Sequence, residues 1–242
     1  MKNTQIDSLP VIPLRDMAPQ PGTTLPMFVG RERSKNAVKA AAARKTPIIL
    51  VSQKTIGVES PKPEDLYGVG VLGELNQVLE HPDGTIRIVV TSKYRGYLRD
   101  VSADDKHISA SFEKIEAGTG SGDIKKAARE VSKSFGSYCK YREDDMLAES
   151  RRLLGRLSEL QTQIQALRVA KEALQKLDDP IMLADMVPGY VNTQVQPEKL
   201  GDPETIKMLD ARIRAKQAIL SEPDPVKRLQ MLRRFIEGEM GK

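Results

Sequence analysis

Residue types that could catalyse a reaction are few in this chain. Two Ser-x-x-Lys pairs, Ser111 with Lys114 and Ser137 with Lys140, have a spacing at which a lysine could activate a serine nucleophile. The first pair falls in a strand-like stretch, where residues three positions apart point to opposite faces of a sheet. Such spacing is also common by chance. We therefore interpret both pairs as coincidental and predict no catalytic residue.

Two histidines and one cysteine are the remaining candidate bases or metal ligands. His81 lies in a turn-like His-Pro-Asp-Gly run, and His107 follows a charged run at 104–106, so we expect both to be solvated loop residues. Cys139, being alone, excludes an internal disulfide framework and a cysteine-rich zinc site. We therefore expect no metal and no cofactor. The cysteine usage is typical of a cytoplasmic, reducing compartment.

A glycine-rich stretch at 117–123 superficially resembles a phosphate-binding loop. A working loop of that kind ends in Gly-Lys-Ser/Thr after a strand, so that backbone amides and the lysine converge on phosphate. Here Gly122 is followed by Asp123, whose carboxylate would repel a nucleotide. We interpret residues 118–123 as a flexible linker.

The net charge of +5 raises the question of nucleic-acid binding. Residues 1–119 hold 16 Lys and Arg against 14 Asp and Glu, and residues 120–242 hold 22 against 19, so neither half is strongly basic. Trp is absent, and 4 Phe and 6 Tyr provide few stacking surfaces for bases. The composition allows weak, salt-sensitive contact with nucleic acid but does not favour a dedicated sequence reader.

No segment has the pattern of a membrane anchor. Wholly apolar runs, such as those at 48–51 and 88–90, are far too short to cross a bilayer. Residues 1–8 are polar and lack the apolar stretch of a secretory signal. We expect no membrane contact.

The first half of the chain, to about residue 116, has the pattern of short strands. A Pro-Asp-Gly turn between two apolar runs predicts a β-hairpin. Ile86, Ile88 and Val90 share one face of the second hairpin strand, and we expect this face to be core. One alanine-rich helix at 35–44, with Ser34 as its predicted N-cap, interrupts the strands. The predicted strands lie at 9–14, 25–29, 47–52, 69–79, 85–90, 94–101 and 108–115.

From residue 123 the pattern becomes helical. Asp123 is the predicted cap of one helix, and a second, long helix is predicted at about 144–177. The apolar positions of the long helix recur with the spacing of a coiled coil over about three heptads. This seam could pack within the chain's own helical bundle or join two copies of the chain. The seam residues are Leu153, Leu157, Leu160, Ile164, Leu167 and Leu174.

Asp-Pro steps at 179–180, 202–203 and 224–225 predict further helix starts, because proline is tolerated in the first turn of a helix. The sequence thus predicts an α+β protein. A small β-rich, barrel-like domain at 1–117 and a linker at 118–123 precede an α-helical bundle at 124–242 with one long helix.

Several segments resemble the amino-terminal region of Lon-type ATP-dependent proteases. The most specific is Leu-Pro-Met-Phe-Val-Gly-Arg-Glu-Arg-Ser at 25–34, after Leu-Pro-Val-Ile-Pro-Leu-Arg-Asp at 9–16. The resemblance is strong over residues 9–100 and looser afterwards. Further matching segments lie at 49–54, 64–70, 79–85, 178–180, 183–185 and 226–229.

The resemblance implies a PUA-like β domain followed by a helical bundle. It also implies a non-catalytic region that recruits unfolded or damaged proteins and supports assembly of a hexameric ATP-dependent serine protease. The ATPase and Ser-Lys protease domains lie downstream in that family, and no segment of this sequence resembles them. The alternative is a stand-alone adaptor that dimerises through its long helix, without a motor or a protease.

Binding to unfolded protein is expected to use exposed apolar and long amphipathic side chains. The matching segment at 25–34 supplies the candidates, three in the strand and three at the following helix entry. In the alternative interpretation Met27 and Phe28 are core residues and the charges are merely solvated. The candidate residues are Pro26, Met27, Phe28, Arg31, Glu32 and Arg33.

Overall fold

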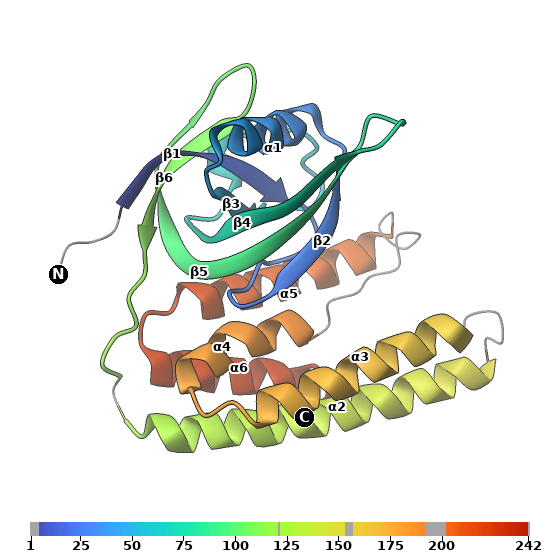
Figure 1. Cartoon of the computed structure of the whole chain (residues 1–242). Coiled ribbons are helices and arrows are strands. Elements are labelled where there is room, and N and C mark those ends of the chain that lie inside the picture. The colour runs from blue at the N-terminus through green and yellow to red at the C-terminus, as the bar shows by residue number, and fades with distance from the viewer. Residues whose placement is uncertain (1–4, 121, 153–156, 192–201, 242) are drawn as a thin grey trace. The chain divides into compact units, whose positions relative to one another are not determined.

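The computed structural model describes residues 5–120, 122–152, 157–191 and 202–241 (Figure 1). The chain divides into two compact units, one of Met1–Glu116 with Gln194–Ser221 and one of Ala117–Thr193 with Glu222–Lys242. Each unit is therefore built from two separate stretches of sequence. The protein is α+β, as predicted, with a six-stranded sheet in the first unit and helices in the second. None of the described helices is long and apolar enough to span a membrane.

The strands of the first unit close into a barrel, as the sequence predicted. Their order is β2-β5-β4-β3-β1-β6, and an additional pairing of β5 with β6 closes a ring of β5, β4, β3, β1 and β6, to which β2 adds beside β5. β1 and β3 are parallel, and the other pairs are antiparallel. The strands are β1 (Gln5–Leu14), β2 (Thr24–Val29), β3 (Ile48–Ser52), β4 (Val69–Glu80), β5 (Ile86–Ala103) and β6 (Ile108–Lys114).

Strand β5 pairs with β4 on one edge and with two different strands, β2 and β6, on the other. Its first part pairs with β2, and its part from Gly96 onward pairs with β6. Gly96 permits this closure, because a Cβ there would lie 2.3 Å from Cζ of Phe112. The separate strands predicted at 85–90 and 94–101 are thus one continuous strand, since β4 pairs with it on both sides of the intervening residues.

The only α-helix between the described strands is α1 (Glu32–Arg44), which connects β2 to β3. Its inner face packs against β1, β2, β3 and β5 through Ala37, Val38 and Ala41. The predicted N-cap at Ser34 is wrong. The helix begins earlier, after Arg31, whose carbonyl accepts the first helical hydrogen bond from the Lys35 amide. Ser34 is therefore buried in the first turn.

The barrel interior follows the predicted alternation. Ile86, Ile88 and Val90 are buried on one face of β5, and they join the cluster that includes the inner face of α1. A second cluster, centred on Ile49 and Phe112, fills the other end of the barrel. A short 3-10 helix, η1 (Pro63–Asp65), precedes β4.

Helix α5 (Pro203–Ser221) belongs to the first unit although it is distant in sequence. Leu209 and Ile213 pack on Ile56, and the Gln217 side-chain amide donates to the carbonyl of Val69 at 3.1 Å. The observed units therefore differ from the predicted division at 118–123, because an amphipathic stripe in the sequence does not identify the surface that will cover it.

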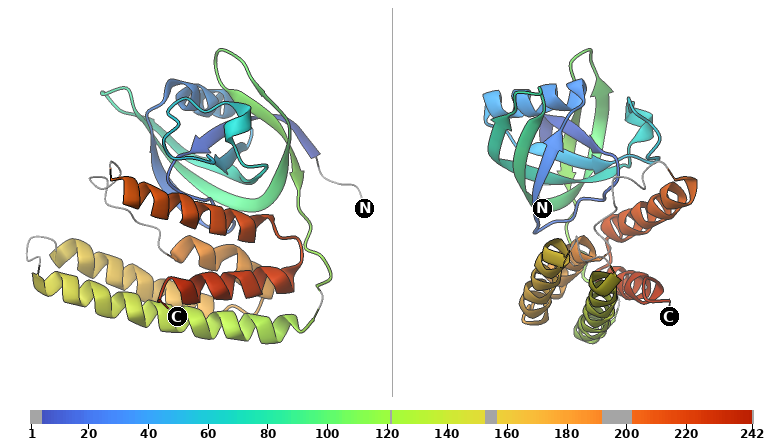
Figure 2. Two further views of the ribbon diagram at one scale, coloured as in Figure 1. Left: turned by 180° about the vertical axis from the view of Figure 1, so that it is seen from behind. Right: turned by 90° about the vertical axis from the view of Figure 1, so that its right-hand side faces the viewer.

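The second unit contains the remaining described helices. Helices α2 and α3 lie side by side (Figure 2), and they are antiparallel because Glu143 contacts Arg168 while Met146 contacts Leu160. On α6, Arg228 is almost fully buried and pairs with Asp185 of α4. The elements are α2 (Ile124–Arg152), α3 (Leu157–Gln175), α4 (Pro180–Met186), η3 (Val187–Tyr190) and α6 (Pro225–Gly238).

The predicted single helix at 144–177 is wrong. Its first part continues α2, its second part is α3, and the two fold back on each other. The heptad spacing arises because the α3 side chains face α2: Leu160, Ile164 and Leu174 are buried and Leu167 is half-buried. Leu153 and the side chain of Leu157 lie outside the described residues. This burial favours packing within the chain, and self-association through the seam stays a prediction.

The predicted cap at Asp123 and the predicted helix starts at the three Asp-Pro steps are confirmed. The Asp123 carboxylate accepts from the Lys126 amide at the start of α2, and Asp202 does the same for Thr205 at the start of α5. Asp179 and Asp224 cap α4 and α6. Local chemistry therefore sets four helix starts.

Candidate functional site

The most exposed apolar side chain among the described large hydrophobic residues is Phe28, at 69%. It lies on β2 directly opposite Arg87 of β5, which in turn lies opposite Leu79 of β4. Residues opposite each other in antiparallel strands share a face, so these side chains form one row across three strands. Leu79 is also exposed, at 48%. The neighbouring row holds Pro26, Val89 and Gln77.

We call these two rows the outer strand face. The face is exposed because β2 alternates: Thr24, Pro26 and Phe28 point to solvent, while Leu25, Met27 and Val29 pack towards the core. Its members are Pro26, Phe28, Gln77, Leu79, Arg87 and Val89.

The structure thus separates the predicted strand candidates. Pro26 and Phe28 lie on the outer strand face, whereas Met27 packs against the core cluster beneath α1. Leu79 and Arg87 were not among the candidates. Only the strand register brings them beside Phe28, and register over sixty residues is not a local property of the sequence.

His81 extends the outer strand face at the hairpin turn. Its ring lies against the Phe28 ring, with centroids 5.8 Å apart and planes at 56°. The turn is held by a hydrogen bond from the His81 amide to the Thr85 carbonyl at 2.8 Å and by a positive φ of 81° at Gly84. His81 is therefore half-buried rather than fully solvated, which corrects the prediction.

The predicted charged candidates lie at the start of α1, and each contacts its own fold. Arg31 donates to the Gln53 side chain, Glu32 pairs with Lys35, and Arg33 donates to the Asp104 carbonyl at 2.8 Å. Partial burial, which is the main cause, and then the nearby Arg15 cation lower the pKa of Arg31. These residues hold the helix entry in place, and Glu32 remains exposed.

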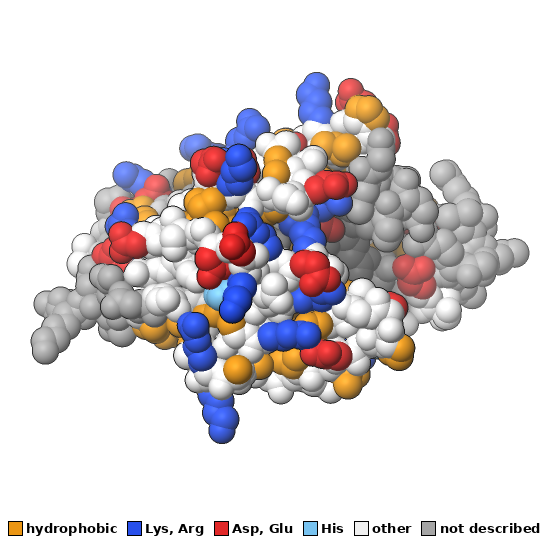
Figure 3. Space-filling model, turned by 90° about the horizontal axis from the view of Figure 1, so that it is seen from above, with side chains coloured by type: hydrophobic (Ala, Val, Ile, Leu, Met, Phe, Trp, Pro, Cys, Tyr) orange, Lys and Arg blue, Asp and Glu red, His pale blue; other side chains and the backbone are white. Residues whose placement is uncertain are grey.

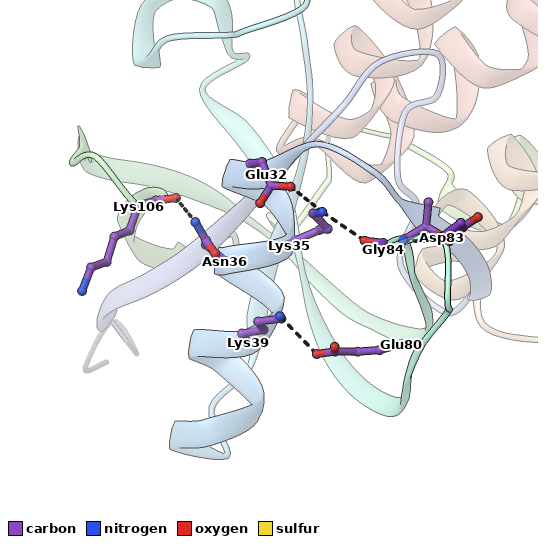
Figure 4. Close-up of polar contacts among 9 residues, drawn as sticks. Glu32, Lys35, Asn36, Lys39, Glu80, Asp83, Gly84 and Lys106 are labelled. Carbon is purple, nitrogen blue, oxygen red and sulfur yellow. Dashed lines mark hydrogen bonds and ion pairs between the residues drawn. The ribbon is translucent and has the colours of Figure 1, made fainter.

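Helix α1 also holds the tip of the β4–β5 hairpin (Figure 4). Lys35 donates to the Gly84 carbonyl at 3.0 Å, and Lys39 pairs with Glu80 at 3.2 Å. On its other side, Asn36 donates to the Lys106 carbonyl at 3.1 Å in the β5–β6 loop. The helix therefore positions both loops relative to the outer strand face.

Beyond these contacts, a groove of about 540 Å³ opens between the C-terminal end of α1 and β4. One wall consists of residues at the end of α1 and those that lead into β3, and the other is the middle of β4. The groove is lined by Ala41, Ala42, Lys45, Thr46, Pro47, Glu74, Leu75, Asn76, Gln77 and Val78.

The second unit has a smaller cavity of about 350 Å³ between α2 and α6. Four of the polar side chains that line it bond to one another: Arg233 pairs with Glu130 and Glu237 at 2.8 Å each, and Ser134 donates to Glu237 at 3.1 Å.

The structure also places the Ser-x-x-Lys pairs, Cys139 and His107. No hydrogen bond joins serine to lysine in either Ser-x-x-Lys pair among the described residues, and Lys114 pairs with Glu116 at 3.0 Å. Burial raises the pKa of the Cys139 thiol to about 12, so the reactive thiolate is disfavoured. His107 is buried, not solvated as predicted, because it leads directly into β6. Among the described residues, no group of three or more His, Cys, Asp or Glu could hold a metal ion.

Acidic and basic side chains are interspersed on the face seen from above Figure 1, with hydrophobic side chains between them (Figure 3). This mixture offers no continuous positive track for a phosphate backbone on that face. The outer strand face itself offers apolar side chains for contact, and Arg87 is the one cation among its members.

Comparison with known proteins gives a consistent result. A family model described as the ATP-dependent protease La (LON) substrate-binding domain matches residues 8–199. The Lon protease of Haemophilus influenzae is 33% identical over 195 residues, which cover 81% of this chain and 22% of that protein. The Lon protease of Escherichia coli K12 is 28% identical over 236 residues, which cover 96% of this chain and 25% of that protein. The chain thus spans about a quarter of the length of these relatives.

Two solved structures share the fold. The N-terminal domain of Mycobacterium avium complex Lon protease superposes with a TM-score of 0.59 at 19% identity, covering 95% of this chain and 98% of that one. A Lon N-terminal domain protein from Xanthomonas campestris superposes with a TM-score of 0.51 at 13% identity, covering 94% and 97%.

Proposed function

Because the chain belongs to the family of ATP-dependent protease La (Lon) substrate-binding domains, we propose that it recruits unfolded or damaged proteins to a Lon-type ATP-dependent serine protease. The observation that carries this proposal is the outer strand face, on which Phe28 is 69% exposed in one row with Leu79. Unfolded chains expose apolar side chains that folded proteins bury, so an exposed apolar face selects for them.

In this proposal the chain itself is non-catalytic, and ATP use and peptide-bond cleavage occur elsewhere in the protease. The proposal includes assembly into a homo-oligomer, a hexamer in the whole enzyme, and a cytoplasmic location like that expected from the cysteine usage. A single small apolar face binds an unfolded chain with roughly micromolar affinity. Several copies in one assembly raise the effective concentration and so tighten capture.

A stand-alone adaptor that dimerises through residues 144–177 has less support. The seam that would form its interface is largely occupied, since Leu160, Ile164 and Leu174 are buried within the chain. The interspersed charges likewise give less support to nucleic acid as the main partner.

The test compares two forms of one client. Reduced and carboxymethylated lysozyme, which stays unfolded, is titrated against the fluorescently labelled chain, with native lysozyme as the folded control. We expect measurable affinity for the unfolded form and none for the native form at the same concentrations. Equal binding of both forms would contradict the proposal, as would ATP hydrolysis or peptide cleavage by the purified chain alone.

A further inference from the structure

The edge of β4 is unpaired over the part of the strand nearest the hairpin turn. β3 pairs with β4 only as far as Gly73, which lies opposite Ile48, the first residue of β3. From Glu74 to Glu80, β4 pairs with β5 on one side, and no described strand pairs with its other side. Alternate residues of this segment therefore direct backbone N–H and C=O groups away from the sheet.

The groove beside α1 lies along this unpaired edge. Its lining includes the β4 residues from Glu74 to Val78 and, on the opposite wall, Thr46 and Pro47, which immediately precede β3. The groove is thus the position that β3 would occupy if the strand began before Ile48 and stayed paired with β4. Ala41 and Ala42 form the helix wall, and their small side chains leave room for those of another chain.

The middle of the edge lacks the protection that exposed strands commonly carry. Charges stand at its two ends, where Glu74 pairs with Lys93 and Glu80 pairs with Lys39. Between them, Val78 and Leu79 are both exposed. A strand edge with consecutive exposed apolar residues is a template for pairing with another extended chain.

One basic side chain of the groove is not paired with an acidic residue in the described part of the chain. Lys45 follows α1 and lines the groove, and it makes no ion pair among the described residues. The acidic groove residue Glu74 is already paired with Lys93. The groove therefore complements an extended segment that carries an acidic side chain beside Lys45.

We propose that Glu74–Glu80 captures a client by strand addition: an extended segment of unfolded polypeptide lies in the groove, pairs with the β4 edge and places an acidic residue beside Lys45. Backbone pairing supplies affinity that is independent of client sequence, which suits a receptor for many unfolded proteins. Alternate side chains of the added strand continue the row of Leu79 and Phe28 on the outer strand face. This inference rests on the proposed function and specifies how the client is held.

The first test fills the groove with a side chain. Ala42→Phe places a ring at an exposed position that lines the groove, and Ala43→Phe, at the next exposed position, does not line it. Unfolded carboxymethylated lysozyme is the probe for both variants of the full chain. We expect Ala42→Phe to weaken binding about tenfold and Ala43→Phe to leave it unchanged. Thermal unfolding of both variants controls for folding.

The second test reverses a charge and does not fill the groove; it again compares one variant with a matched control. Lys45→Glu and Arg44→Glu change the net charge equally at adjacent exposed residues, but only Lys45 lines the groove. We expect weaker binding in Lys45→Glu alone. In the wild-type chain, the same probe should slow hydrogen exchange of amides within Gln77–Leu79.

The outcomes separate the two proposals. If the wild-type chain binds native and unfolded lysozyme equally, the proposed function fails. If it prefers the unfolded form but Ala42→Phe and Lys45→Glu match their controls, or the Gln77–Leu79 amides exchange at the same rate with and without the probe, strand addition is wrong and the proposed function stands. Loss of binding in Ala42→Phe and Lys45→Glu with retention in both controls supports strand addition.

Discussion

Adjacent residues of β2 lie in different environments, because a strand directs successive side chains to opposite faces. Phe28 faces solvent beside His81, and Met27 packs beneath α1. The core interpretation therefore holds for Met27 but not for Phe28, whose role in binding stays a prediction. Residue type alone does not distinguish them, since phenylalanine is the more hydrophobic choice for a core.

Phe28 and Met27 form a matched pair for mutation. Phe28→Ser should weaken binding of unfolded lysozyme several-fold with little effect on the free energy of unfolding, because its side chain is mostly exposed. Met27→Ser should lower the free energy of unfolding by about 1–3 kcal/mol, since it removes apolar contacts from the core. Chemical denaturation and the binding titration measure both. Equal effects of the two variants on the free energy of unfolding would contradict the assignment of Phe28 to the surface and Met27 to the core.

Asp104 confers a pH dependence on the β5–β6 loop. Its carboxylate accepts from the His107 and Lys106 amides at 2.7 and 2.8 Å, and these bonds lower its pKa below the usual 3.8. A carboxyl group with a lowered folded-state pKa stabilises the fold above the unfolded-state pKa, and this contribution is lost as pH falls through the folded-state pKa.

Asp104→Asn should therefore destabilise the protein at pH 7, and the difference from wild type should shrink as pH falls below about 4. Denaturation curves between pH 2.5 and pH 7 measure this. Asp105→Asn, at the neighbouring exposed residue, controls for the change in net charge. A difference that stays constant with pH would refute the role of the carboxylate.

Among the elements, most local signals predict the observed structure, the N-cap at Ser34 being an exception, whereas the partners of elements distant in sequence are not predictable. Aspartate caps predicted helix starts because capping involves residues within three positions of each other. The apolar seam at 144–177 predicts one long helix. The same heptad pattern arises when the facing side chains come from an antiparallel helix of the same chain, so the pattern does not show where the helix is interrupted. The fold class and most strands could thus be predicted, whereas Leu79, Arg87 and His81 of the candidate site depend on register and could not.

The α2–α3 hairpin gives a prediction about the seam. Leu160→Ala should lower the free energy of unfolding by about 2–4 kcal/mol, because the side chain is buried against Met146 and Ile164. We expect sedimentation velocity to give the same oligomeric state for this variant and for wild type under native conditions. A change from oligomer to monomer without loss of stability would instead assign the seam to self-association.

For the whole chain, the dependence of the barrel on α5 is the main long-range feature. Leu209 and Ile213 cover Ile56, and Leu220 packs with Val69 and Val71. The Arg95 guanidinium also donates to the Leu220 carbonyl at 2.6 Å within this buried contact. A helix that begins about ninety residues after the last strand thus completes the hydrophobic surface of the barrel unit.

Ile213→Ala should therefore destabilise the barrel, although residue 213 is far from every strand in sequence. We expect a loss of about 2–4 kcal/mol, seen as faster hydrogen exchange of the buried amides near Val69 and Val71. Arg214→Ala, on the exposed side of α5, is the control. Unchanged exchange in Ile213→Ala would show that α5 does not support the strands.

The position of α5 also sets an order of events during synthesis. β6 ends at Lys114 and α5 at Ser221, so roughly a hundred residues leave the ribosome between them. At about 5–20 residues per second, this interval lasts on the order of 5–20 s. Throughout that time the nascent barrel presents Ile56, Val69 and Val71 without their covering helix. The chain that we propose as a receptor for unfolded proteins would thus itself display an uncovered apolar surface during translation, and a ribosome-associated chaperone would find its binding site there until residue 221 emerges.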